Sequence, residues 1–129
     1  MSSEYFTDAE LSCRCGCGFK ITNKVFLRKL DFVREDVDEP MILNSAARCK
    51  KHNKAIGGAR NSAHALADPV AVDIRCKNSR LRYKIVGAAY REGFRRIEVS
   101  GKRKGVNTMA WIHVDSATED TGHQQDVLF

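Results

Sequence analysis

The feature that most constrains this chain is a pair of short segments, residues 70–75 and 109–115, in which apolar and small or polar side chains alternate. Alternation with a period of two is typical of a strand that has one buried face. In the second segment this pattern places Ile112 and Val114 in the core. Both segments are therefore predicted to be strands whose other face is available for chemistry.

The faces opposite the core carry candidate metal ligands. Asp73 lies beside the small Ala71 in the first segment, His113 lies in the second, and His64 precedes the first. Catalytic zinc sites use three protein ligands and leave a fourth position to water. His64, Asp73 and His113 form such a set, although one histidine near a strand more often makes an ordinary hydrogen bond.

The residues around these candidates match a known pattern. Residues 44–64 contain Arg-Cys, then His-Asn, a Gly-Gly turn and Ser-Ala-His; Asp-Ile follows at 73–74, and His-Val-Asp closes the pattern at 113–115. The sequence resembles the zinc peptidases of the D-alanyl-D-alanine carboxypeptidase family, which includes vancomycin-resistance D,D-dipeptidases and many phage endolysins. The hedgehog signalling domain shares their fold. The resemblance extends from about Tyr5 to about Ser116.

The resemblance implies an α+β fold, with a small antiparallel sheet flanked by helices and a zinc site on one face of the sheet. It implies that Zn²⁺ is held by His64, Asp73 and His113. Arg48 matches the family arginine that binds the substrate near its scissile bond or carboxylate, a task that suits a planar guanidinium. The alternative for Arg48 is a salt bridge on a helix surface. The expected substrates are peptidoglycan stem peptides, cut at a D-Ala-D-Ala or an L-Ala-D-Glu bond.

Two departures from the family pattern matter. Eight residues separate His64 from Asp73 where the family usually has six, and Asp68-Pro69 lies in the gap. If both ligands lie on strands, an even-numbered insertion keeps their side chains on the same side. The second departure concerns the proton carrier, since relatives have an acidic residue three positions before the last histidine and this chain has Ala110.

Two carboxylates are candidates for the missing general base. Asp115 is preferred because it shares a strand face with His113, and Glu98 is the other candidate. Asp115 has an alternative role as a residue that orients a ligand histidine.

Composition sets the remaining expectations. A length of 129 residues predicts one domain, residues 1–129, with a polar tail from about residue 117. The net charge of +6 favours anionic partners. The absence of an aromatic and basic platform or a helix-turn-helix pattern argues against nucleic acid, and the absence of a long apolar run argues against a membrane. A monomer is expected.

The N-terminus lacks a signal pattern. We therefore expect a phage endolysin that is made in the cytoplasm of an infected bacterial host and acts on the cell wall after release. The alternative is a non-catalytic phage structural or wall-binding module of the same fold, which the altered spacing and Ala110 would support.

Local patterns predict the other elements. A Thr-x-x-Glu capping box begins a short helix near residues 6–11. Further helices are expected at 22–37, at 46–55 with Arg48 in its first turns, and at 79–91, and strands at 41–43 and 96–100. The strand at 96–100 is expected to pair with residues 109–115. Their basic connection, residues 101–105, is either a solvated turn or a contact to wall polymer or nucleic acid.

Five cysteines do not form a standard pattern. Cys13, Cys15 and Cys17 occupy alternate positions, whereas structural zinc sites usually use Cys-x₂₋₄-Cys pairs, and Cys49 and Cys76 stand alone. Reduced thiols in a cytosolic protein are the plain interpretation. A disulfide and a second metal site remain open.

Overall fold

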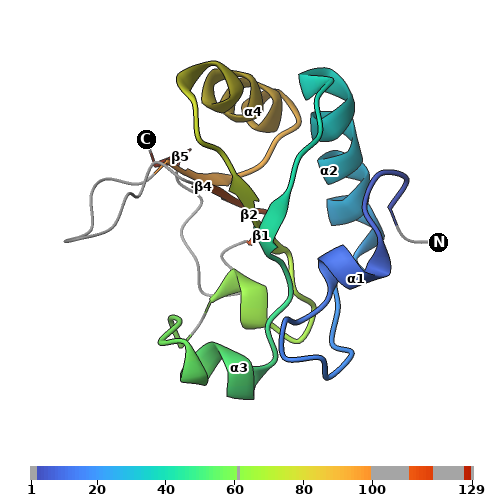
Figure 1. Cartoon of the computed structure of the whole chain (residues 1–129), viewed down its shortest axis with the longest axis vertical. Helices are drawn as coiled ribbons and strands as arrows, with labels where there is room; N and C mark the ends of the chain where they lie inside the picture. Colours follow the sequence, from blue (N-terminus) through green and yellow to red (C-terminus); the bar gives the residue numbers. More distant parts are fainter. Residues whose placement is uncertain (1–2, 61, 100–110, 118–126, 129) are drawn as a thin grey trace.

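The computed structural model describes residues 3–60, 62–99, 111–117 and 127–128. Its elements follow one another along the chain as Figure 1 shows. They are α1 (Asp8–Leu11), α2 (Lys24–Val37), β1 (Leu43–Ser45), α3 (Lys50–Ala55), the 3₁₀ turn η1 (Ala63–Ala65), β2 (Ala71–Arg75), α4 (Ser79–Arg91), β3 (Arg96–Glu98), β4 (Trp111–Asp115) and β5 (Val127–Leu128).

The strands form one sheet in the order β1-β2-β4-β3-β5. The first four strands pair antiparallel, which confirms the predicted α+β class with a small antiparallel sheet. The last strand, β5, runs parallel to β3 at the edge of the sheet. The predicted polar tail from about residue 117 thus includes a short strand, which the lack of periodicity in that region did not indicate.

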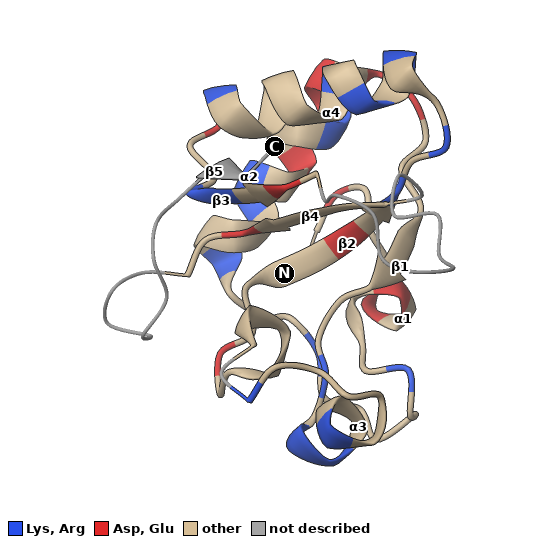
Figure 2. Cartoon of the chain, turned by 90° about the vertical axis from the view of Figure 1, so that its left-hand side faces the viewer, with Lys and Arg blue, Asp and Glu red and all other residues tan. Residues whose placement is uncertain are grey.

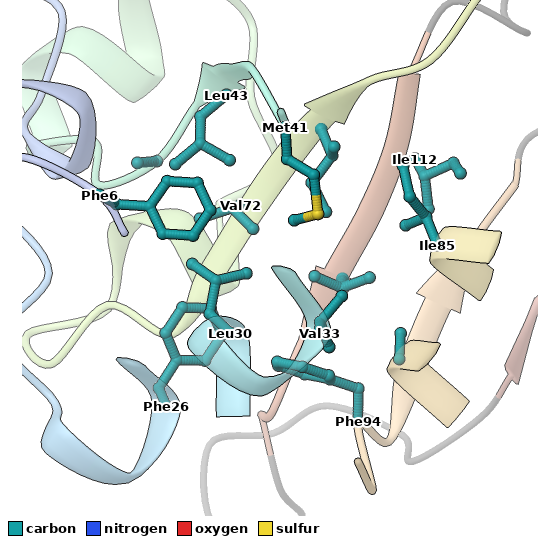
Figure 3. Packing of buried hydrophobic residues seen from close by; sticks show 14 of the residues in the cluster. Phe6, Phe26, Leu30, Val33, Met41, Leu43, Val72, Ile85, Phe94 and Ile112 are labelled. Atoms are coloured by element: carbon teal, nitrogen blue, oxygen red, sulfur yellow. The ribbon is translucent and has the colours of Figure 1, made fainter. Parts of the chain in front are cut away.

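One face of the sheet is apolar and packs against helices. In β2 and β4 the alternation places Val72, Ile74, Ile112 and Val114 on this face, where all four are buried. Figure 3 shows side chains of α2, α4 and the strands meeting in this core, and the rings of Phe26 and Phe94 pack edge to face there with centroids 5.6 Å apart. The opposite face is therefore the one left for polar groups.

The helices lie on both sides of the sheet. Figure 2 shows α4 on one side and α3 on the other, and α2 packs against α4. Helix α4 spans the predicted residues, and α2 begins after Asn23, whose side-chain oxygen accepts the N–H of Phe26 as an N-cap. The capping box predicted for α1 is confirmed between Thr7 and Glu10. No helix among the described residues is long and apolar enough to cross a membrane.

Two elements differ from the prediction. The first strand covers Leu43–Ser45, not residues 41–43, because its pairing with β2 begins at Leu43, opposite Ile74, and Ile42 is half exposed. Helix α3 begins at Lys50, not at residue 46, because Cys49 is its N-cap. Arg48 consequently precedes the helix. The predictions for residues 101–105 and for Ala110 lie outside the described residues.

Candidate metal centre

Sheet register places three polar residues in one row. Asp73 on β2 is directly opposite His113 on β4, and His113 is directly opposite Glu98 on β3. Residues that face one another across antiparallel strands share a face of the sheet, with Cβ atoms ~4.5–5.5 Å apart. The row therefore lies on the face opposite the core.

A fourth residue reaches this row from η1. His64 is almost completely buried, and its Nε2 is 3.2 Å from Asp73 Oδ1 and 3.2 Å from His113 Nδ1. Nδ1 of His113 is 2.9 Å from the same Asp73 oxygen. The structure thus brings together the three residues that the sequence proposed as ligands, with one donor atom of each at a common point.

The orientation of His64 is set by its own loop. Its Nδ1 donates to the carbonyl of Ala46 at 2.6 Å, which leaves the lone pair of Nε2 directed at the cluster. A backbone hydrogen bond joins the same two segments, because the N–H of Arg48 donates to the carbonyl of His64 at 2.8 Å. Ser62 Oγ accepts the backbone N–H of His64 at 3.2 Å. Residues 46–48 and η1 therefore hold each other in place.

The orientation of His113 is set by Asp115. His113 Nε2 donates to Asp115 Oδ2 at 2.7 Å, on the side of the ring away from Asp73 and His64. The other Asp115 oxygen accepts the N–H of Ala117 at 3.0 Å, and Arg96 lies 3.7 Å from Oδ2. Asp115 is fully buried. These contacts fit the alternative role of orienting a ligand histidine, and the preferred role as general base stays a prediction.

The electrostatics of the cluster favour a positive charge. Burial would lower the pKa of His113, but hydrogen bonds to Asp115 and Asp73 outweigh burial and raise that pKa to about 9. Burial would likewise raise the pKa of Asp73, but its contacts with the His113 and His64 rings hold that pKa well below its usual range. Two carboxylates thus surround one imidazole and favour a cation at this point.

The donor set fits zinc. Ligand atoms ~2.0–2.1 Å from a tetrahedral zinc ion are roughly 3.3–3.4 Å from one another. The three donor-to-donor distances here are 2.9, 3.2 and 3.2 Å. Two imidazole nitrogens and one carboxylate oxygen are ligands that zinc prefers. His64 Nε2, Asp73 Oδ1 and His113 Nδ1 would hold the ion, and all three residues line the same cavity.

A cavity of about 370 Å³ opens over this cluster. Its walls include Arg48, Ser62, Glu98 and Trp111 besides the three candidate ligands. This volume is within the usual range for a small-molecule pocket. Glu98 is half-buried and lies on the cavity side of the row, so it is a carboxylate of the wall that is open to a substrate.

Arg48 is fixed at the rim of the cluster. Its Nη1 donates to Asn53 Oδ1 at 2.9 Å, and its Nη2 is 4.0 Å from Asp73 Oδ2. Asn53 is buried and donates in turn to the carbonyl of Ala59 at 2.8 Å. Burial lowers the pKa of Arg48, with Asp73 acting in the opposite direction. Arg48 is therefore a half-buried cation in the cavity wall and not a residue of a helix surface.

Gly58 leaves no room for a side chain beside this arginine. A Cβ at Gly58 would overlap Asn53 Oδ1 and would lie 2.7 Å from Arg48 Nη1. We expect Gly58→Ala to displace Asn53 and Arg48 while His64, Asp73 and His113 stay in place. An activity of the site that uses Arg48 should fall ~10²-fold, as expected for a small misplacement of a positioning group, with metal content unchanged. Gly87→Ala in α4 is the matched control, and equal activity of the two variants would contradict this role of Gly58.

The extra residues between His64 and Asp73 leave the cluster undisturbed. Asp68 points toward α2, where its Oδ2 accepts the Asn23 side-chain N–H at 2.8 Å. The reason differs from the prediction: His64 lies in η1 and not on a strand, so the parity of the insertion has no bearing. The loop lengthens at the surface and β2 begins at Ala71, which keeps Asp73 in register with His113.

An α+β fold with a His-Asp-His cluster on the polar face of its sheet, open to a cavity, defines a candidate metal-dependent hydrolase. A family model described as Peptidase M15 matches residues 4–115, and the chain belongs to this family. Comparison with curated proteins finds no significant match.

Proposed function

We propose that this protein is a zinc metallopeptidase that cleaves the stem peptides of bacterial peptidoglycan. The observation that carries the proposal is the convergence of His64, Asp73 and His113 at the floor of a cavity in a chain of the Peptidase M15 family. When bound there, Zn²⁺ would supply a Lewis acid for the scissile carbonyl and would lower the pKa of water toward ~7. The net charge of +6 favours approach to an anionic wall.

We propose Glu98, in place of the preferred Asp115, as the residue that moves the proton. Hydrolysis needs a group that takes a proton from the attacking water and returns it to the leaving amine. Glu98 and Asp115 both line the cavity, but both oxygens of Asp115 accept hydrogen bonds, from His113 and Ala117, whereas Glu98 lies beside His113 in the row and is half-buried. Glu98 lies beside His113 because of the register in which β3 pairs with β4. We therefore assign the proton transfer to Glu98 and the orientation of His113 to Asp115.

The test of the function is hydrolysis by the purified, zinc-loaded chain. Muropeptides that end in D-Ala-D-Ala and muropeptides that contain L-Ala-D-Glu are incubated separately, and the products are separated by chromatography. Release of D-Ala identifies a carboxypeptidase, and cleavage within the stem identifies an endopeptidase. Binding to the wall without hydrolysis of either substrate would overturn the proposal in favour of the non-catalytic module.

Arg48 should bind the substrate through a paired contact. Its guanidinium lies in the cavity wall near Asp73, held by Asn53. Arg48→Lys keeps the charge but loses the planar pair of donors, so we expect most of the activity to be lost while zinc content and fold are retained. If Arg48 pairs with a free carboxylate of the substrate, the wild-type protein should hydrolyse substrates in which that carboxylate is amidated more slowly. Unchanged turnover of the variant would return Arg48 to a structural role.

The proposed biological setting is lysis by a phage. The protein would be made in the cytoplasm of an infected bacterium and would act as a monomer on the wall after release. Expression in a bacterial host with and without a membrane-permeabilising holin tests this setting. Lysis only in the presence of both proteins is the expected result, and lysis that is independent of the holin would contradict release from the cytoplasm.

A further inference from the structure

A second cluster of ligand-type residues lies outside the cavity. Cys13, Cys15 and Cys17 come from the loop after α1, and Cys49 is the N-cap of α3. The four Sγ atoms all lie within 4.8 Å of one another. No sequence pattern joins Cys49 to the first three cysteines, because more than thirty residues separate them.

The spacing of the sulfur atoms matches a tetrahedral ion and not a disulfide. The Sγ atoms of Cys13 and Cys15 are 3.4 Å apart, and those of Cys15 and Cys49 are 3.7 Å apart. A disulfide bond is ~2.0 Å long. Four thiolates ~2.3 Å from a tetrahedral zinc ion are roughly 3.8 Å from one another. A multi-iron cluster would need a wider cage, because several irons and sulfides lie between its thiolates.

The loop is folded so that alternate cysteines converge. In an extended strand, residues two apart are separated by ~6.6–6.8 Å along the chain, more than the sulfur spacing found here. The loop closes through an antiparallel bridge between Ser12 and Lys20, and the N–H of Cys13 donates to the carbonyl of Phe19 at 2.7 Å. Gly16 and Gly18 have φ of +84° and +90°, a conformation that other residues rarely adopt. These two glycines allow the loop to curl around a point.

Backbone N–H groups point at the sulfur atoms. The N–H of Cys49 donates to Cys13 Sγ at 3.4 Å, and the N–H of His52 donates to Cys49 Sγ at 3.3 Å. Such donors stabilise thiolates, which are the form that binds a metal.

We propose that Cys13, Cys15, Cys17 and Cys49 bind one Zn²⁺ as a closed structural site, separate from the His64–Asp73–His113 centre. Four protein ligands fill a tetrahedral ion and leave no position for water, so this site has no catalytic chemistry of its own. Its ligands tie the N-terminal loop to the start of α3. Cys49 directly follows Arg48, whose N–H holds the carbonyl of His64, so the ion anchors the segment that positions both residues.

The proposal is tested by metal content of the whole chain, purified with reductant and without added metal. Wild-type protein should carry two zinc ions per chain and Cys17→Ser one, because Cys17 is exposed and its loss removes a ligand without opening the core. The double variant His64→Ala/His113→Ala should also carry one. Cys76→Ser, at a cysteine outside the cluster, is the matched control and should keep both ions.

Cobalt substitution keeps the test decisive even if a cysteine variant fails to fold. The His64→Ala/His113→Ala protein loaded with Co²⁺ should show intense thiolate-to-cobalt charge-transfer absorption and tetrahedral ligand-field bands. The proposal is overturned if this variant binds no metal, if its cobalt form lacks the thiolate bands, or if mass spectrometry of the wild-type protein finds disulfides among the four cysteines. It is independent of the peptidase function, since none of these readouts measures hydrolysis.

Discussion

Replacing any one of His64, Asp73 and His113 by alanine should remove the zinc ion of the cavity and abolish hydrolysis of peptidoglycan peptides. Each residue supplies one of three donor atoms that lie 2.9–3.2 Å apart. A site left with two ligands cannot complete the three-ligand set typical of catalytic zinc. Zinc content and turnover, measured on the same samples, check the prediction. Circular dichroism confirms that each variant is folded.

Asp68 provides the matched control for this series. It is the carboxylate that lies between His64 and Asp73 in the chain, and it bonds to Asn23 at the surface. Asp68→Ala should therefore keep the zinc ion and full activity. If Asp68→Ala lost the ion while Asp73→Ala retained it, the assignment of Asp73 as the ligand would be wrong.

The sequence predicted what depends on local periodicity. Strands with a period of two place Ile112 and Val114 in the core and His113 on the other face, and the structure has this arrangement. The long helices and the capping box at Thr7 follow from side-chain spacing in the same way. The identity of the three candidate ligands came from residue type and family resemblance, and the folded sheet brings them together.

The sequence could not predict what depends on pairing between distant segments. Glu98 enters the row beside His113 only through the register of β3 and β4, and no residue pattern fixes that register. The contact of Cys49 with the N-terminal loop arises because α3 begins at Lys50, with Cys49 as its N-cap. Cysteine is an uncommon N-cap, which explains why the helix was predicted to start too early.

Glu98→Gln should keep the cavity zinc and lower turnover ~10²–10⁴-fold, the usual contribution of general acid–base catalysis. Glutamine preserves the size of the side chain and its place in the row but cannot accept the proton of the attacking water. The variant should bind zinc as tightly as wild-type protein, because Glu98 is not among the three donors. Zinc affinity and single-turnover hydrolysis together measure the two effects.

Asp115→Asn should show the opposite pattern. Its carboxylate accepts the Nε2–H of His113 at 2.7 Å and is fully buried, so its charge acts on the zinc ligand. Loss of such a partner typically lowers metal affinity ~10–100-fold. At saturating zinc the Asp115 variant should recover most of its activity, whereas the Glu98 variant should not. The opposite result would contradict this assignment. If Glu98→Gln regained activity at high zinc while Asp115→Asn stayed inactive with its zinc site full, Asp115 would be the proton carrier and Glu98 would not.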